Sequence, residues 1–229
     1  MGWTEWIRDG VEVEPSLYAA DFRRLGEQID ALLAAGCRVF HFDCGDGHFV
    51  PPVTMGPVVV RSIARSIQEA GGRIDCHLMV DDPAHHIAEF ASSGADSVTF
   101  HVEAAASTAA RVAAEARAHG LGVGIAFNPE TEPARAAEVA AAAGADLVLC
   151  MSIQPGYSGQ SFMPEALGRI EALASLVDVP IQVDGGVGEE NVRALRDAGA
   201  SLLVAGSSVF SGPDPAEAYA RLAAAAAAA

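Results

Sequence analysis

Two histidines and two aspartates in this sequence are of the types that bind metal ions and move protons. His41 and Asp43 stand two residues apart in a short apolar segment, His77 lies in the next such segment, and Asp184 directly precedes two glycines. If these segments are β-strands, residues two apart share a face, so His41 and Asp43 point the same way. Such a mixed set of imidazole and carboxylate ligands suits Zn²⁺, Mn²⁺ or Fe²⁺ better than Ca²⁺ or Mg²⁺.

Each of these residues also has a structural explanation, because a histidine can be a hydrogen-bonded core residue and an aspartate a turn or a cap. That explanation is favoured for any one of them alone. All four lie towards the ends of apolar segments, where an unpaired buried charge is costly, so together they favour a metal site. His101 is ambiguous, and we expect it to fill the core, because the interiors of barrels are mostly packed side chains.

Short β-branched segments alternate with Ala- and Leu-rich amphipathic stretches along the whole chain, a pattern typical of parallel strand-helix units. Eight units can be counted, which predicts a single α/β domain with the TIM (β/α)8 barrel fold. The alternative is a doubly wound open sheet, but its first strand should run into a glycine-rich loop, and here it runs into Pro15–Tyr18. Residues 1–10 are predicted to be an N-terminal extension and residues 11–229 the barrel. The predicted strands are Val11–Leu17, Val39–Cys44, Ile74–Val80, Ser97–Val102, Gly122–Phe127, Asp146–Ser152, Pro180–Asp184 and Leu202–Ala205.

Glycines follow the last three predicted strands, where a barrel commonly binds a phosphate group. The segment Pro155–Gln160 follows the sixth strand, Gly185 and Gly186 follow the seventh, and Gly206 and Ser207 follow the eighth. Glycine lets backbone N–H groups approach an anion closely. One such pair would be a weak signal, because turns use glycine anyway, but three successive ones predict a phosphate site.

The composition narrows the classes of function. The formal net charge is −16 and no cluster of basic residues exists, so a nucleic-acid partner is not expected. All 14 basic residues are arginine, which excludes Schiff-base aldolases and Walker-A NTPases because both need a lysine. The charged N-terminus is neither a signal peptide nor a membrane span, so we expect a cytoplasmic protein without membrane contact. The four cysteines form no CxxC pair, and we expect them to be reduced and buried.

The segments that carry these residues resemble, in order, the signature motifs of the ribulose-phosphate 3-epimerase family. The resemblance covers about Pro15 to Ala218. It implies a metal-dependent isomerase of the pentose phosphate pathway that interconverts D-ribulose 5-phosphate and D-xylulose 5-phosphate through an enediolate. The motifs are PSLYAADF (Pro15–Phe22), HFDCGDGHFVPPVTMGP (His41–Pro57), DCHLMV (Asp75–Val80), MSIQPGYSGQSF (Met151–Phe162), VDGGV (Val183–Val187) and VAGSSVF (Val204–Phe210).

The resemblance also implies the roles of particular residues. His41, Asp43, His77 and Asp184 match the ligands of one divalent metal ion, which would be Zn, Fe, Mn or Co, and the two aspartates match the acid/base pair. The small-molecule partner implied is a phosphorylated ketose, and the protein is expected to be a homo-oligomer. The residues expected to contact the substrate are Ser16, His77, Met79, Met151, Gly156, Tyr157, Ser158, Gly159, Gly185, Gly186, Gly206 and Ser207.

The chain departs from the family pattern at a few positions. The family usually has methionine where this chain has Gly45, serine at Ala19, asparagine at Pro52, and Phe-Gly at Tyr157-Ser158. None of these changes removes a metal ligand or a carboxylate. The smaller residues at Gly45 and Ala19 predict a looser pocket wall, which would admit either water or, as we expect, a longer ketose.

Three alternative functions stay open at this point. A 3-epimerase for another phosphoketose, such as allulose 6-phosphate, would keep the same residues and differ only in the pocket lining. A barrel decarboxylase or aldolase would be a lyase, and the absence of lysine speaks against it. A non-catalytic phosphosugar-binding barrel has no reason to keep two carboxylates beside two histidines.

Overall fold

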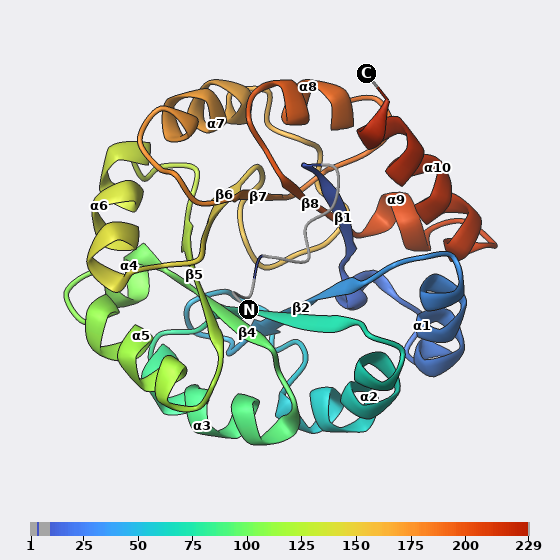
Figure 1. The fold of residues 1–229 in the computed structure, drawn as a ribbon, viewed down its shortest axis with the longest axis horizontal. Coiled ribbons are helices and arrows are strands. Elements are labelled where there is room, and N and C mark those ends of the chain that lie inside the picture. The colour runs from blue at the N-terminus through green and yellow to red at the C-terminus, as the bar shows by residue number, and fades with distance from the viewer. Residues whose placement is uncertain (1–3, 5–9, 229) are drawn as a thin grey trace.

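Eight parallel strands form a barrel surrounded by helices in the computed structural model of this protein, which describes residues 4 and 10–228 (Figure 1). The predicted TIM barrel is confirmed. The strands are β1 (Glu12–Pro15), β2 (Val39–Gly45), β3 (Arg73–Met79), β4 (Ser97–His101), β5 (Gly122–Phe127), β6 (Leu147–Met151), β7 (Ile181–Asp184) and β8 (Leu202–Ala205). The helices are η1 (Leu17–Ala19), α1 (Leu25–Ala34), α2 (Pro57–Glu69), α3 (Pro83–Ser93), α4 (Val102–Ala105), α5 (Ala109–Ala118), α6 (Pro133–Ala143), α7 (Ala166–Ala174), α8 (Val192–Asp197), α9 (Ser207–Phe210) and α10 (Pro215–Ala227).

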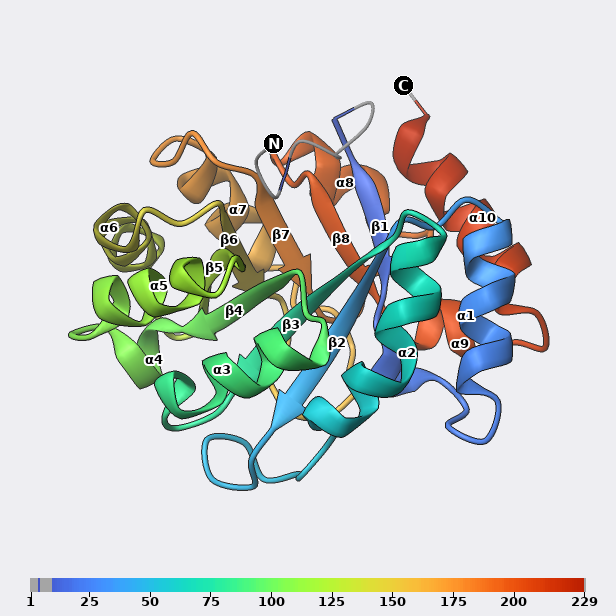
Figure 2. The same ribbon diagram turned by 60° about the horizontal axis from the view of Figure 1, so that its bottom comes forward.

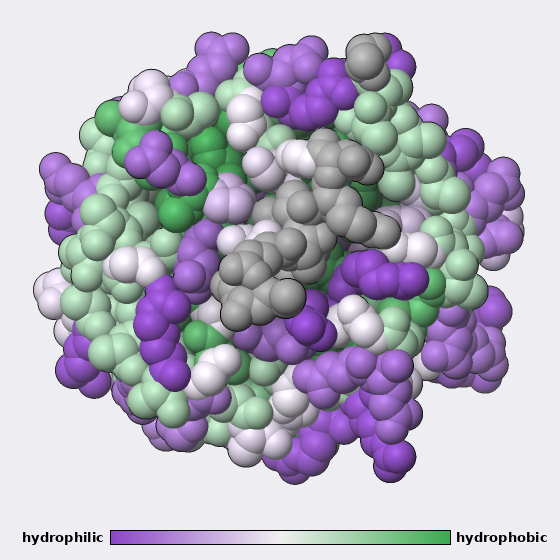
Figure 3. Space-filling model, in the orientation of Figure 1, coloured by the Kyte–Doolittle hydropathy of each residue, from purple (hydrophilic) through white to green (hydrophobic). Residues whose placement is uncertain are grey.

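Proline and glycine mark the ends of several outer helices. Proline occupies the first turn of α2, α3, α6 and α10, where its fixed φ suits a helix and its missing N–H costs nothing. Gly94 and Gly144 end α3 and α6 with φ of 99° and 58°, a left-handed conformation that glycine adopts without steric cost. Hydrophilic side chains gather around the rim of the face that Figure 3 shows, as expected for amphipathic helices that turn one side to water.

The strands pair in the order β1-β8-β7-β6-β5-β4-β3-β2, and the ring closes between β1 and β2. A parallel bridge between Ser16 and His41 makes this closure. In Figure 2, β2 runs downward and the loop that follows it lies at the lower edge, so the carboxyl ends of the strands meet on that side. An open, doubly wound sheet would have unpaired edge strands, and that alternative is therefore wrong.

Two layers of core side chains follow from the alternation along the strands. Phe42 and Cys44 point outward into the layer between strands and helices, where they belong to one cluster with Ile63 of α2. Leu149 and Met151 lie in a second cluster inside the barrel. The alternation predicted for the second strand, with His41 and Asp43 facing inward, is therefore confirmed.

One side of the barrel interior is polar, which is uncommon for a space that is fully enclosed. Glu14, Asp75, Thr99 and Gln182 are all completely buried there. Strands β5, β6 and β8 line the opposite side with small or apolar side chains. The metal-ligand candidates therefore lie above a buried polar network.

The predicted strand bounds agree with the structure to within about two residues at each end. The predicted extension, residues 1–10, lies outside the described residues apart from Thr4 and Gly10. The four cysteines are buried and free, as expected.

Candidate active site

His41, Asp43, His77 and Asp184 come together at the carboxyl ends of β2, β3 and β7. One ligand atom from each of the four residues lies within 4.8 Å of all the others. Asp43 Oδ1 lies 3.3 Å from His41 Nε2 and 3.1 Å from His77 Nδ1, whereas Asp184 Oδ2 lies 3.9 and 3.8 Å from the same nitrogens. Both histidines are completely buried. The cluster can therefore be reached only from the side of the two carboxyls, which line the pocket.

Two further carboxyls lie behind His41. Its Nδ1 is 3.5 Å from Asp75 Oδ2 and 3.7 Å from Glu14 Oε2. Gln182 holds these carboxyls together, because its Nε2 donates to Glu14 Oε2 at 2.6 Å and to Asp75 Oδ2 at 2.8 Å. His41 is thus surrounded by carboxyl oxygens on both sides of its ring.

The electrostatics of this cluster favour a positive charge between the ligand atoms. Burial lowers the pKa of His41, but Asp43, Asp75 and Glu14 outweigh burial and raise that pKa well above its usual value. Burial raises the pKa of Glu14 to about 7, because no cation compensates its charge fully. A divalent ion would offset the cost of burying these carboxylates together.

The two pocket-facing carboxyls have opposite pKa shifts. Burial raises the pKa of Asp43, but His41 and His77 outweigh burial and hold that pKa well below its usual range. Burial, together with the negative charge of Asp43, raises the pKa of Asp184 to about 7. Asp43 is therefore ionised near neutrality while Asp184 can hold a proton.

The donor set fits a divalent metal ion. Neither ring nitrogen of His41 has a hydrogen-bond partner within the described part of the chain, although both are buried. A buried imidazole nitrogen without a partner is costly unless a cation or proton meets it. Two imidazoles and two carboxylates match the ligand preferences of Zn²⁺ and of the transition metals Mn²⁺, Fe²⁺ and Co²⁺.

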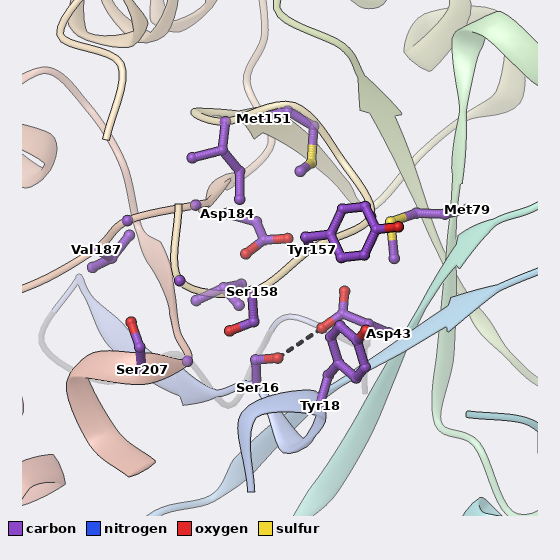
Figure 4. Close-up of a pocket in the computed structure, with 17 residues that line it drawn as sticks. Ser16, Tyr18, Asp43, Met79, Met151, Tyr157, Ser158, Asp184, Val187 and Ser207 are labelled. Atoms are coloured by element: carbon purple, nitrogen blue, oxygen red, sulfur yellow. Dashed lines mark hydrogen bonds between the residues drawn. The ribbon is translucent and has the colours of Figure 1, made fainter. Parts of the chain in front are cut away.

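A pocket opens directly above the cluster, and Asp43 and Asp184 both point into it (Figure 4). Ser16 Oγ donates to Asp43 Oδ2 at 2.7 Å, and the buried side chains of Met79 and Met151 form apolar parts of the wall. The lining residues are Ser16, Tyr18, Asp43, Met79, Met151, Ile153, Gly156, Tyr157, Ser158, Gly159, Asp184, Gly185, Gly186, Val187, Val204, Gly206 and Ser207. The structure thus brings every residue expected to contact substrate to this one pocket except His77, which belongs to the metal-ligand cluster.

Three glycine-containing loops meet at one end of the pocket, as the sequence predicted. Gly185 and Gly186 have φ of 125° and 62°, and a Cβ on Gly186 would lie 2.5 Å from the backbone nitrogen of Phe162. No hydrogen bond is found for the backbone N–H of Gly185 or Gly186 among the described residues. These glycines therefore allow a tight turn and leave two donors free for an anion.

The expectation that Gly45 loosens the pocket wall is wrong. A Cβ on Gly45 would lie 2.8 Å from Pro52 O and 2.8 Å from Val50 Cγ2, so the loop after β2 already fills this space. Asp46 holds the loop by accepting hydrogen bonds from the backbone N–H groups of His48 and Phe49. The sequence comparison at one position missed this repacking because it could not show the path of the loop.

Replacing Gly45 by alanine should therefore disturb the loop and leave the preference between sugars unchanged. We expect the free energy of unfolding to fall by about 1–3 kcal/mol, the usual cost of overpacking a filled site. Urea unfolding would measure this, together with kcat/KM for ribulose 5-phosphate and allulose 6-phosphate. Gly56→Ala is the matched control, because a Cβ on Gly56 meets open space. A Gly45→Ala protein with unchanged stability and a larger preference for the pentose would contradict the filled wall.

The sequence did not single out Glu14, Asp75 and Gln182, and it left His101 ambiguous, with the core as the expected place. His101 is completely buried, and its Nε2 also lies 2.8 Å from His77 Nε2. A signal for the others existed, because Glu14, Asp75 and Gln182 each precede a site residue by two positions and so share its inward face. Tyr18, Ile153, Val187 and Val204 of the lining were also missed.

Fold and site together define a (β/α)8-barrel protein whose pocket joins a cluster able to hold a metal ion, two carboxyls with opposed pKa shifts and a set of glycine-containing loops. The model of the Ribulose-phosphate 3 epimerase family matches residues 12–210. The chain therefore belongs to the ribulose-phosphate 3-epimerase family.

Individual relatives agree with this membership. The chain is 41% identical to a ribulose-phosphate 3-epimerase of Synechocystis over 216 residues, covering 92% of each chain. It is 38% identical to the ribulose-phosphate 3-epimerase of Escherichia coli K12, covering 88% of this chain and 90% of that one. A crystal structure of 3-hexulose-6-phosphate synthase superposes with a TM-score of 0.71 at 23% identity, covering 94% of this chain and 99% of that one, which shows the shared fold alone.

None of the described helices is both long and apolar enough to cross a lipid bilayer.

Proposed function

We propose that this protein interconverts ribulose 5-phosphate and xylulose 5-phosphate by moving a proton at C3. The observation that carries the proposal is the pair Asp43 and Asp184, which point into one pocket and have opposed pKa shifts. Inversion at a carbon needs a base on one face of the planar intermediate and an acid on the other. Two carboxyls whose environments push their pKa values apart meet that need.

The two carboxyls exchange roles with the direction of the reaction. Asp43, ionised, takes the C3 proton of one epimer, and Asp184, protonated, returns a proton to the opposite face. One turnover leaves the proton on Asp43 and Asp184 ionised, and in this state Asp184 is the base and Asp43 the acid for the other epimer. Ser16 Oγ donates to Asp43 Oδ2, which fixes the orientation of this carboxylate, and Met79 and Met151 keep water from the reacting carbon.

His41, His77, Asp43 and Asp184 would hold one divalent metal ion. When bound, the metal supplies Lewis-acid stabilisation for the oxygens on which negative charge develops. His41 and His77 contribute by staying buried and fixed, so that the cluster does not need to rearrange during the reaction.

The phosphate would be bound mainly by backbone N–H groups and serine hydroxyls, because no arginine lines the described pocket. Gly185 and Gly186 offer free N–H groups, and Ser158 and Ser207 offer hydroxyls. Helix and loop N–H groups of this kind bind phosphate without a cationic side chain.

Unphosphorylated ribulose should accordingly be a poor substrate. A hydrogen bond to a charged group contributes roughly 1.5–3 kcal/mol, so losing about three of them should lower kcat/KM at least ~10³-fold. Steady-state kinetics with ribulose and ribulose 5-phosphate would measure the ratio. Comparable kcat/KM for the two sugars would contradict the phosphate assignment.

The proposed activity is tested directly by incubating the protein with ribulose 5-phosphate in D₂O. We expect NMR to show xylulose 5-phosphate that carries deuterium at C3. Allulose 6-phosphate in a parallel tube tests for activity on a longer phosphoketose. The filled wall at Gly45 gives no extra space for such a substrate. Binding of ribulose 5-phosphate without any exchange at C3 would favour the non-catalytic barrel.

Cytoplasmic location and assembly into a homo-oligomer stay predictions. A rice relative that is 34% identical is named as a cytoplasmic isoform, which supports the first of them. Light scattering after size-exclusion chromatography would test the second.

A further inference from the structure

A chain of three hydrogen-bonding groups leads away from the metal-ligand cluster on the side opposite the pocket carboxyls. His77 uses Nδ1 toward Asp43 and Nε2 toward His101 Nε2, at 3.1 and 2.8 Å. His101 Nδ1 lies 3.3 Å from Glu103 Oε2. Both imidazoles are completely buried, and nothing in the proposed mechanism uses His101 or Glu103.

With a cation in the ligand cluster, the positions of these atoms decide where the protons lie. A carboxylate only accepts hydrogen bonds, so His101 must carry its proton on Nδ1 to meet Glu103 Oε2. A neutral imidazole with a proton on Nδ1 has a bare Nε2, which must accept from His77 Nε2. His77 then has its lone pair on Nδ1, the nitrogen that faces Asp43 and Asp184, and this is the tautomer that can bind a cation. Without a cation, the ionised Asp43, 3.1 Å from the same nitrogen, favours a proton there instead.

Neighbouring groups hold this arrangement in place. Glu103 Oε1 accepts hydrogen bonds from Asn128 N, at 2.9 Å, and from Thr131 Oγ1, so its other oxygen is left for His101. Phe49 packs against the ring of His101 with 4.8 Å between the ring centroids. His101 is completely buried, and burial disfavours the charged form of an imidazole.

We infer that His101 and Glu103 are positioning residues that favour the tautomer of His77 with its proton on Nε2, so that its Nδ1 lone pair is presented to the metal ion although Asp43 competes for a proton on this nitrogen. The inference rests on the proposed function, because it assigns a role toward the metal in that site. Partners of this kind on the far nitrogen of a ligating histidine orient the ring and raise its basicity. Glu103 thus influences the tautomer of His77 through His101, which lies between them.

Glu103→Gln is the sharpest test, because the surroundings dictate how the amide lies. Asn128 N–H and Thr131 O–H both need an acceptor, so the amide oxygen takes the place of Oε1 and the NH₂ group faces His101. His101 must then accept on Nδ1 and carry its proton on Nε2. This proton is donated to His77 Nε2, which moves the proton of His77 to Nδ1 and blocks the ligand atom.

Two measurements on the full-length protein follow. Long-range ¹H–¹⁵N NMR should place the proton of His101 on Nδ1 in the Zn²⁺-loaded wild type and on Nε2 in metal-free Glu103→Gln. Competition with a chromophoric chelator should show that Zn²⁺ and Co²⁺ bind about 10–100-fold more weakly to Glu103→Gln than to the wild type. Glu138→Gln, an exposed carboxylate paired only with Arg135, is the matched control and should bind both ions like the wild type.

A second pair of variants separates a positioning role from simple packing. In His101→Gln the side-chain oxygen can reach the position of Nε2 and still accept from His77, whereas His101→Leu fills the space without an acceptor. We expect His101→Gln to bind Zn²⁺ more tightly than His101→Leu, with circular dichroism confirming that both are folded. Equal Zn²⁺ affinity of the wild type and Glu103→Gln, or a His101 protonated on Nε2 in the Zn²⁺-loaded wild type, would overturn the inference. A wild type that binds neither ion would instead overturn the metal site, and the role of His101 and Glu103 toward it would fall with it.

Discussion

Asp43→Asn and Asp184→Asn should each lower kcat at least ~10²-fold, the usual scale for losing a general acid or base. Asparagine keeps the size of the side chain but cannot take up or release a proton. Because we propose that the two carboxyls serve opposite faces of the substrate, each variant should lose both directions of the epimerisation. Steady-state kinetics in both directions would measure the loss.

Isotope exchange makes this prediction more specific. Each variant keeps one carboxyl, so it should still exchange the C3 proton of one epimer with solvent D₂O, and the two variants should differ in the epimer that exchanges. Metal content must be measured in parallel, since both residues are also ligand candidates. Asp30→Asn, on the exposed side of α1, is the control and should keep full activity. Near-wild-type kcat in either site variant would mean that the acid/base assignment is wrong.

Prolonged chelation should abolish activity, and Zn²⁺, Mn²⁺, Fe²⁺ or Co²⁺ should restore it. The physical reason is the cluster of His41, His77, Asp43 and Asp184, with the carboxyls of Glu14 and Asp75 buried behind it. Without a cation these carboxyls repel one another in a region from which water is excluded. Activity would be assayed after the metal has been removed and again after each ion has been added back.

Stability gives a second readout that does not depend on turnover. An ion at about 1,000 times its Kd should add about 4 kcal/mol to the free energy of unfolding. Thermal unfolding with and without Zn²⁺ would show this as a rise in Tm, and Mg²⁺ or Ca²⁺ should give a smaller rise because both prefer oxygen ligands. Full activity in a preparation shown to be free of metal would contradict the assignment.

The polar interior of the barrel places carboxyl groups behind both histidines of the candidate metal site. Asp75 and Glu14 lie behind His41, and His101 and Glu103 lie behind His77. Each of the two histidines therefore has a carboxyl near its far nitrogen. For His41 the carboxyl lies directly beside the ring, and for His77 it acts through a second imidazole. The two histidines are not equivalent, because only His77 is held by a neutral ring.

The sequence by itself determined the barrel and the ligand candidates. Eight segments with strand periodicity, each followed by an amphipathic helix, permit few other topologies, and the alternation along a strand placed His41 and Asp43 on one face. Glycines after the last three strands predicted loops that line one end of the pocket, because the ends of parallel strands meet at one edge. These features are local or periodic and can be read along the chain.

Only the tertiary structure decided how the site is closed and supported. The filled wall at Gly45 depends on Pro52 and Val50, which reach back from a loop whose path no local pattern specifies. The opposed pKa shifts of Asp43 and Asp184 arise from burial and from neighbours on β2 and β3. The contact between His77 and His101 joins residues 24 apart in the chain, and its meaning depends on which nitrogen faces which partner. Distances and hydrogen-bond directions between strands are set by the closure of the barrel. They depend on residues far apart in the chain, so no local sequence pattern reveals them.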